Sequence, residues 1–450
     1  MMRRPVSTFF LAALLMLAAA LPGRAEAAER FEYISGDYTY TVHPDGSAVI
    51  TRYSGSAKNL AVPETMDGLQ VRAIGDFAFY RRDSLTGVTL PAGLLRIGNR
   101  AFLDCAALRS VALPEGLLSI GDGAFFGCDG LVTLSLPNSL AEMGANPFEN
   151  TVIRITLSPD HPRFALVNGV LYDKTKKSLV SYPAKDPAVT FAVPTGILVI
   201  GDRAFSGAGA LISVILPDSL VEIGNGAFFR CGALTAVSLP SGLRTIGNQA
   251  FSRCGLLADL TLPDGLESIG YEAFYRCASL NIGVWPAGLK SIGNLAFFRC
   301  GGLTKVALPA GLATIGDDAF SSCESLTDVI LQEGLVSIGE GTFSINPALV
   351  SVTLPEGMKS LGDRAFSECS KLVSITLPQS LESIGAEAFS KCESLASVAI
   401  PARVSYIGFG AFAESPTVIL MVERQSYAAA WAAENGVPYA YPDALEWLIP

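Results

Sequence analysis

Apolar residues recur along this chain at a fixed interval of 23 residues. Each copy of the pattern holds a hydrophobic residue, a glycine, two variable residues, a small residue and a phenylalanine. Fourteen copies keep both the glycine and the phenylalanine, and they start at Ile74, Ile97, Ile120, Met143, Ile200, Ile223, Ile246, Ile269, Ile292, Ile315, Ile338, Leu361, Ile384 and Ile407. Because the spacing does not slip within a run, equivalent positions of successive copies are expected to lie side by side.

The full unit predicts two short strands followed by a turn of helix. It reads Leu108-x-x-Val111-x-Leu113-Pro114-x-Gly116-Leu117-x-x-Ile120-Gly121-x-x-Ala124-Phe125-x-x-Cys128. The first part alternates as a strand does, and the proline ends that strand because it cannot donate to a ladder. The next Leu-x-x-Ile predicts a second strand, its glycine a turn with positive φ, and Ala-Phe-x-x-Cys about one helical turn.

One unit is too small to bury its own apolar side, so stacked units must share a continuous core. Each inward position then becomes a ladder, including a phenylalanine spine that runs from Phe79 to Phe412. The pattern therefore predicts a repeat solenoid of short parallel strands over residues 73–412.

The N-terminal end of such a stack needs a cap, since an open end exposes core and strand edges. Tyr38 to Val42 and Ala48 to Tyr53 alternate around Pro44-Asp45-Gly46. This arrangement predicts a β-hairpin that caps the stack within residues 28–72.

The C-terminal end carries a second cap, which we place in residues 413–450. Thr417 to Val422 predicts a last strand. Ser426 predicts the N-cap of a helix that runs to Asn435 and stops at Gly436. Trp431 on that helix is expected to cover the exposed end of the core.

The repeat is interrupted once, between Met143 and Ile200, and we predict an irregular repeat with an inserted hairpin at about residues 149–199. Val167 to Tyr172 and Ser178 to Tyr182 flank a charged tip that contains Asp173, Lys174, Lys176 and Lys177. These four residues form a candidate recognition loop, because loops on rigid scaffolds often carry binding. The alternative, which we favour, is an irregular repeat that only adjusts the curvature.

The repeat resembles the BspA-type leucine-rich-repeat family over roughly residues 60–415, on its Ile-Gly-x-x-Ala-Phe-x-x-Cys signature. The resemblance implies a leucine-rich-repeat solenoid, a right-handed superhelix with short parallel strands and single helical turns. It also implies a bacterial surface or secreted protein of the kind associated with adhesion, coaggregation and binding of host matrix proteins. It carries over no catalytic residue.

The first 27 residues are predicted to be a signal peptide. Arg3 and Arg4 precede an apolar run from Val6 to Leu21, and the small residues of Ala25-Glu26-Ala27 place cleavage after Ala27. The run is shorter than the ~20 residues of a membrane span, and we expect no transmembrane segment after cleavage. Cleavage removes three positive charges and one negative charge, so the net charge changes from −10 to −12. A chain this acidic is an unlikely nucleic-acid partner, because nucleic acids demand a basic surface.

Nine cysteines in an exported chain raise the question of disulfides. All nine lie three residues after the repeat phenylalanine, at Cys105, Cys128, Cys231, Cys254, Cys277, Cys300, Cys323, Cys369 and Cys392. Alanine and serine replace cysteine at this position in other copies, which indicates a small buried slot. We therefore predict a ladder of reduced thiols and no structural metal.

The sequence contains no pattern that predicts catalysis, a cofactor or a metal site. Its two histidines, His43 and His161, lie in turn-like segments and are expected at the surface. Asp317-Asp318 follows a repeat glycine, where a turn residue is more plausible than a glycosidase pair. No phosphate-binding glycine motif is present.

One charged feature distinguishes four successive repeats from the others. Four successive copies carry arginine two residues after the phenylalanine, at Arg230, Arg253, Arg276 and Arg299, and Phe229, Tyr275 and Phe298 precede three of them. Such a row could bind a sulfated or phosphorylated glycan, or an acidic protein surface. The alternative, which we favour from sequence alone, is a row left by repeat duplication, with each arginine solvated or bonded to turn carbonyls.

These observations predict a secreted or cell-surface protein, not an enzyme, that mediates protein-protein or cell adhesion. Its expected partner is a protein or an anionic glycan on host matrix or other cells. The alternative is a structural envelope or matrix protein that assembles with itself.

Overall fold

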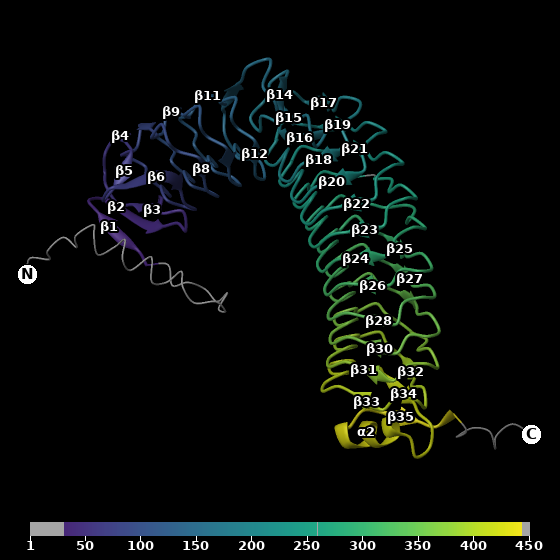
Figure 1. Ribbon diagram of the computed structural model, residues 1–450. Coiled ribbons are helices and arrows are strands. Elements are labelled where there is room, and N and C mark those ends of the chain that lie inside the picture. Colours follow the sequence, from purple (N-terminus) through teal and green to yellow (C-terminus); the bar gives the residue numbers. More distant parts are fainter. Residues whose placement is uncertain (1–30, 259, 443–450) are drawn as a thin grey trace, which may run out of the picture. The chain divides into compact units, whose positions relative to one another are not determined.

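A computed structural model describes residues 31–258 and 260–442 (Figure 1). The predicted signal peptide therefore lies outside the described residues. The described residues form a β-solenoid of about 17 turns with little helix, which confirms the predicted repeat solenoid of short parallel strands. It divides into two compact units, residues 1–172 and 173–450, and each is described by itself.

In the first unit, the second strand of each repeat extends one parallel ladder that begins at the N-terminal hairpin. The hairpin strands pair antiparallel, and the latter of them pairs parallel with the first repeat strand. In spatial order this sheet contains β1 (Tyr33–Ser35), β2 (Tyr38–Val42), β3 (Ala48–Tyr53), β6 (Leu69–Ile74), β8 (Arg96–Ile97), β10 (Ser119–Ile120) and β12 (Glu142–Met143), with β5 (Thr65–Met66) beside β6. The cap prediction is therefore confirmed, with β1 as an additional strand.

The first strands of these repeats form a separate face. They are β4 (Asn59–Ala61), β7 (Gly87–Thr89) and β9 (Ser110–Ala112) in one sheet, and β11 (Thr133–Ser135) and β13 (Arg154–Thr156) in another. In the interruption, β14 (Phe164–Val167) and β15 (Val170–Asp173) precede β16 (Ser178–Ser181), and the predicted strands on both sides of the charged turn are present.

The second unit repeats this plan over a longer stack, whose rungs follow one another from β16 to the yellow C-terminal end in Figure 1. Its second strands are β18 (Val199–Ile200), β20 (Glu222–Ile223), β22 (Thr245–Ile246), β23 (Ser268–Ile269), β24 (Ser291–Ile292), β26 (Thr314–Ile315), β28 (Ser337–Ile338), β30 (Ser360–Leu361), β31 (Ser383–Ile384) and β33 (Tyr406–Ile407). Its first strands are β17 (Thr190–Ala192), β19 (Ser213–Ile215), β21 (Ala236–Ser238), β25 (Lys305–Ala307), β27 (Asp328–Ile330), β29 (Ser351–Thr353), β32 (Ser397–Ala399) and β34 (Ile419–Met421).

The C-terminal cap matches its prediction closely. Helix α2 spans Tyr427–Asn435, the Ser426 side chain accepts a hydrogen bond from the Ala429 N–H, and Gly436 ends the helix with a φ of 68°. Trp431 packs edge-on against the last ring of the spine, Phe412, with centroids 6.2 Å apart. A further strand that the sequence did not suggest, β35 (Tyr439–Ala440), pairs with β34.

The repeat phenylalanines form a buried spine in each unit. Neighbouring rings are nearly parallel, for example Phe228 and Phe251 at 4.9 Å and 5°, and Phe297 and Phe320 at 5.1 Å and 4°. Each ring buries a large apolar area and also stacks on the next, so the same contact provides hydrophobic stabilisation and fixes the register.

The segment around each phenylalanine is a run of hydrogen-bonded turns and not the single helical turn that its spacing predicts. In one repeat, the N–H groups of Gly226, Phe228 and Arg230 donate to carbonyl oxygens of the next repeat at 2.7, 2.7 and 2.9 Å. The residues between them donate within the turn instead, as Phe229 does to Gly226 at 2.9 Å. A helix would direct all these groups along its own axis, so the stack replaces helical hydrogen bonds with bonds between repeats.

The glycine of the motif was expected to adopt a positive φ, and this expectation is wrong. None of the motif glycines is among the residues with positive φ in the described chain. A Cβ on Gly270 would instead lie 2.6 Å from the Asn248 nitrogen and 2.7 Å from the Gly247 carbonyl carbon of the preceding repeat. Glycine is required because backbones approach closely there.

Gly270→Ala is expected to lower the free energy of unfolding by about 1–3 kcal/mol, because the added methyl group forces neighbouring repeats apart. Gly232→Ala is the matched control, since a Cβ there has no neighbour within 4 Å. Urea unfolding of the two variants measures the difference. Equal stability of the two variants would contradict the role that we assign to close backbone approach.

Candidate binding surface

The cysteine ladder is a structural element in the described chain. All nine cysteines are free and buried, which agrees with the predicted reduced ladder. Each thiol donates to the phenylalanine carbonyl oxygen of the preceding repeat, as Cys277 Sγ does to Phe251 O at 3.0 Å. Ser415 Oγ makes the same bond to Phe389 O at 2.7 Å, so the position selects a small donor as well as a small side chain. Burial raises the pKa of Cys277 to about 12, which leaves little nucleophilic thiolate at neutral pH.

The two histidines differ in environment. His43 lies at the surface within 3.1 Å of Asp45, as expected for a turn residue. His161 is fully buried, so its predicted surface position is wrong. Its Nε2 lies 3.0 Å from Pro137 O, and its Nδ1 accepts from the backbone N–H groups of Arg163 and Phe164 at 3.2 and 3.1 Å. The ring therefore closes the Ser-Pro-Asp-His-Pro loop from inside.

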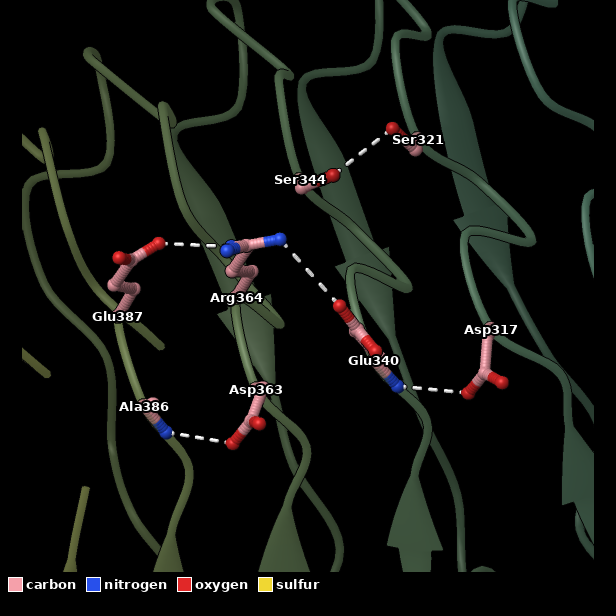
Figure 2. Close-up of polar contacts among 8 residues, drawn as sticks. All are labelled: Asp317, Ser321, Glu340, Ser344, Asp363, Arg364, Ala386 and Glu387. Carbon is pink, nitrogen blue, oxygen red and sulfur yellow. Dashed lines mark hydrogen bonds and ion pairs between the residues drawn. The ribbon is translucent and has the colours of Figure 1, made fainter. Parts of the chain in front are cut away.

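In the Asp317-Asp318 pair, Asp317 is a turn residue whose side chain bonds to the next repeat. Asp317 Oδ1 accepts the backbone N–H of Glu340 at 2.9 Å, and Asp363 Oδ1 accepts that of Ala386 at 2.7 Å (Figure 2). The same bond between successive repeats is made by Asn248 to Tyr271 at 2.8 Å. Burial, together with the nearby Glu340 and Asp317, raises the pKa of Asp318.

In the second unit, charged residues of neighbouring repeats often form ion pairs. Arg364 bridges Glu387 at 2.8 Å and Glu340 at 3.5 Å, as Figure 2 shows. Three further pairs also join residues 23 positions apart: Lys290 with Glu267, Lys359 with Glu382, and Lys391 with Glu368. Opposite charges on adjacent rungs relieve the repulsion that stacking would otherwise create.

The four predicted arginines depart from this arrangement. We call Arg230, Arg253, Arg276 and Arg299 the arginine stripe. All four are exposed and occupy the same left-handed turn position, with φ between 58° and 64°. Their backbone N–H groups bond to the next repeat, which fixes them in register. Within the described residues, no carboxylate forms an ion pair with any of the four.

Aromatic rings support the guanidinium groups of the stripe. Arg230 lies 5.2 Å from the centroid of Phe229, and Arg299 lies 5.4 Å from that of Phe298. The guanidinium groups of Arg253 and Arg276 lie 6.0 and 5.3 Å from the centroid of Tyr275. The sequence therefore identified the residues but not their contacts, which are to rings and not to turn carbonyls.

One member of this surface was missed. Arg203 lies 5.8 Å from the centroid of Phe229, on the side of the preceding repeat. It stands two residues before its repeat phenylalanine, whereas the stripe residues stand two residues after theirs. The sequence could have placed Arg203 beside Phe229 only if both left-handed turn positions of the repeat had been compared.

The electrostatic cost of the stripe is small but unfavourable. The spine rings beneath it are 4.9, 5.3 and 5.1 Å apart, so neighbouring arginines are separated by one rung. Two unit charges about 5 Å apart in water repel by roughly 0.8 kcal/mol. An exposed cation–π contact contributes about 0.5–1 kcal/mol. The rings therefore offset the repulsion and hold the guanidinium groups in place.

The candidate loop is less suited to binding than its sequence suggests. Asp173 is only 4% exposed, and its Oδ1 accepts the N–H groups of Thr175 and Lys176 at 2.8 and 2.9 Å. Lys174, Lys176 and Lys177 are exposed. Asp173 thus shapes the turn, and the three lysines are the part of the loop that a ligand could contact.

The first-strand face is interrupted beside the stripe. Among the described residues, no named first strand occurs between β21 and β25, whereas the second strands β22, β23 and β24 continue through the same repeats. Trp285 is buried in this region and packs edge-on against Phe297 and Phe320. Val284, its neighbour, is 72% exposed.

Other classes of site find no support in the described part of the chain. No group of three or more His, Cys, Asp or Glu side chains in residues 31–258 and 260–442 is placed to hold a metal ion. No helix in the same residues is long and apolar enough to cross a membrane.

Comparison with known proteins identifies the repeat. A family model described as "BspA type Leucine rich repeat region" matches six copies over residues 53–161, 185–304 and 290–419. A leucine-rich repeat protein from Bacteroides ovatus is 23% identical over 91% of this chain and 100% of its own, with a TM-score of 0.48. A leucine rich cell surface protein from Faecalibacterium prausnitzii is 24% identical over 91% and 98% of the two chains, with a TM-score of 0.41. No curated protein matches the chain.

The unfolded, unreduced protein is expected to yield nine thiols with a thiol-specific reagent, and the native protein very few at pH 8. The reason is that burial raises the pKa of Cys277, Cys323 and Cys392 to about 12, above the ordinary value of 9.0. Folded-state pKa values raised in this way stabilise the protein below about pH 9, and this contribution is lost as the pH rises toward 12. A count of one thiol in the unfolded protein would mean four disulfides and refute the reduced ladder.

Arg364→Gln is expected to lower the melting temperature at low ionic strength, since Glu340 and Glu387 then face each other without a cation. The difference from wild type should shrink in high salt, because these exposed charges are screened. Arg276→Gln is the control and should change the melting temperature little, since repulsion and the ring contact offset each other. A larger loss for Arg276→Gln would show that the stripe is structural.

Proposed function

Because the chain belongs to the BspA-type leucine-rich-repeat family, we propose that it is a secreted or cell-surface binding protein that mediates protein-protein or cell adhesion. The family match covers most of the chain and supports a scaffold whose function lies on its surface. The predicted signal peptide supports export, with Ala28 as the first residue of the mature protein.

The observation that carries the proposal is the arginine stripe. A rigid stack holds four exposed arginines in register, leaves them without ion pairs among the described residues, and supports them on aromatic rings. Rigid, pre-oriented side chains lose little entropy when they bind, which favours recognition. The alignment of like charges does not increase stability, so an external anionic partner accounts for it better than folding does.

The chemistry of the core supports binding in preference to catalysis. The thiols donate to carbonyl oxygens within the stack, the His161 ring closes a loop, and the exposed His43 lies in a turn beside Asp45. An enzyme needs such groups directed at a substrate. We therefore propose a non-enzymatic role.

The exposed aromatic residues near the C-terminal end support a second candidate function, self-assembly. Phe409 is 84% exposed and Tyr406 is 55% exposed, both in the last repeat. Exposed apolar side chains at one end of a stack can join one copy to the next, as a structural matrix protein would require.

Labelled mature chain, residues 28–450, tests the two candidates. Adhesion predicts saturable binding to deposited extracellular matrix or to fixed bacterial cells, with displacement by unlabelled chain. It also predicts that the apparent molar mass from light scattering is independent of protein concentration. Self-assembly predicts instead that the apparent molar mass rises strongly with protein concentration and that Phe409→Ser abolishes this rise. That result, together with no saturable binding to either surface, would refute adhesion.

A further inference from the structure

We propose that the arginine stripe binds a linear sulfated glycan that lies along the stacking direction of the repeats. This inference rests on the proposed binding function and specifies the partner of its central surface. Three properties of the stripe support it: its one-dimensional order, the occupied faces of its rings, and the open, nearly acid-free surface beside it.

The order of the charges favours a polymer over a folded protein. Each stripe residue stands one rung from the next, and the spine rings beneath are spaced by 4.9–5.3 Å. Three such steps separate Arg230 from Arg299, which gives a row about 15 Å long. A chain with anionic groups at regular intervals can meet every rung, whereas acidic residues on a folded protein seldom lie on one straight line.

The side-chain chemistry favours a ligand that carries oxyanions. Guanidinium groups present a planar fork that can donate two parallel hydrogen bonds to a sulfate, phosphate or carboxylate. Lysine offers the same charge without the fork, yet all four positions of the stripe are arginine. The ring contacts hold each fork before a ligand arrives, which lowers the entropic cost of binding.

The rings themselves argue against a nucleic acid. Single-stranded nucleic acids bind by stacking their bases on exposed aromatic faces. Tyr275 already stacks on Phe298, at 5.4 Å and 7°, and both rings carry guanidinium groups. The guanidinium groups of Arg203 and Arg230 lie 5.8 and 5.2 Å from the centroid of Phe229. A glycan needs no free ring face, because its anionic substituents contact the forks and its sugars can rest against the half-buried ring edges.

The surface beside the stripe is open to a ligand. The residues two positions further along are small in all four repeats: Gly232, Gly255, Ala278 and Gly301. A Cβ on Gly232 or Gly255 would have no neighbour within 4 Å, so a ligand can approach the guanidinium groups from this side.

Little negative charge opposes such a ligand. At the other left-handed turn position, these repeats carry Gly226, Gln249, Glu272 and Leu295. Glu272 is the acid among them, and its carboxylate already accepts hydrogen bonds from Gln249 and Tyr271, both at 2.7 Å. Residues 223–301 contain six Lys or Arg and four Asp or Glu, whereas the whole chain carries −10.

Calorimetric titration with size-fractionated heparin oligosaccharides tests the proposal on the mature chain. Affinity should rise with oligosaccharide length until the row of about 15 Å is covered, and then level off. Chemically desulfated heparin should bind at least about tenfold more weakly than heparin, since each lost sulfate removes a charge-assisted contact. Hyaluronan, which carries carboxylates alone, should also bind weakly.

The decisive variant replaces Arg230, Arg253, Arg276 and Arg299 with Gln. It should lose at least about tenfold in affinity for a heparin octasaccharide, and the slope of log K against log salt should fall by about two to four. The matched control replaces Arg96, Arg109, Arg154 and Arg403 with Gln, which changes the net charge equally at exposed positions outside the stripe. It should bind within about twofold of wild type. Far-UV circular dichroism and melting must show that both variants are folded.

Replacement of the four arginines with Lys separates geometry from charge. This variant keeps the charge but loses the fork, and we expect it to bind several-fold more weakly than wild type. Equal weakening of the Gln stripe variant and the control would reduce the effect to net charge and overturn the proposal. Absence of heparin binding by wild type would do the same. Tighter binding of oligo-dT, with the same dependence on the stripe, would assign the surface to nucleic acid instead.

Failure of this inference is distinguishable from failure of the proposed function. If wild type and the stripe variant bind cells or matrix equally well, and heparin binding does not depend on the stripe, adhesion stands and the glycan-binding proposal is refuted. If heparin binds through the stripe but the chain adheres to neither surface, the glycan-binding proposal stands and the adhesive function is refuted.

Discussion

The whole structure depends on how closely one repeat can approach the next at the turn around the phenylalanine. There, alternate backbone N–H groups leave the repeat and donate to the following one, while the groups between them are satisfied locally. The motif glycine permits this approach because a Cβ would collide with the preceding backbone. The phenylalanine ring, the thiol and the asparagine or aspartate side chain each add a contact with the same period. Register is therefore fixed by several independent bonds per rung, and a slip would break all of them together.

This turn also determines what the surface can display. Two residues per repeat adopt left-handed backbone angles, and their side chains stand outside the core in matching columns. A non-glycine residue costs about 1–3 kcal/mol in that conformation, and the bonds to the next repeat must compensate for it. Because the columns are in register, any side chain that recurs there forms a row. In the C-terminal repeats the row alternates in sign, as Glu368 and Lys391 do, and in the stripe it does not.

The sequence predicted what depends on period and local chemistry. The spine, both caps and the buried cysteine ladder follow from residue spacing and from rules for helix ends, and Ser426 and Gly436 act at the predicted residues. It could not predict features set by neighbouring rungs. The reason for the motif glycine is a contact with the repeat before it. The burial of His161 depends on Pro137, 24 residues away, and Arg203 reaches Phe229 across a repeat boundary.

A row of like charges on a stacked scaffold has a different meaning from scattered charges on a globular surface. In a stack, an ion pair needs only the opposite charge at the same position of the next repeat, and this chain uses that solution at several positions. The stripe lies in the same kind of column, on the same scaffold, and keeps one sign over four rungs. The neighbouring rings compensate for roughly the repulsion that this creates, which leaves the net stability almost unchanged. Since folding gains nothing from the stripe, we attribute its persistence over four repeats to the proposed partner, which would bring the missing negative charges in a line.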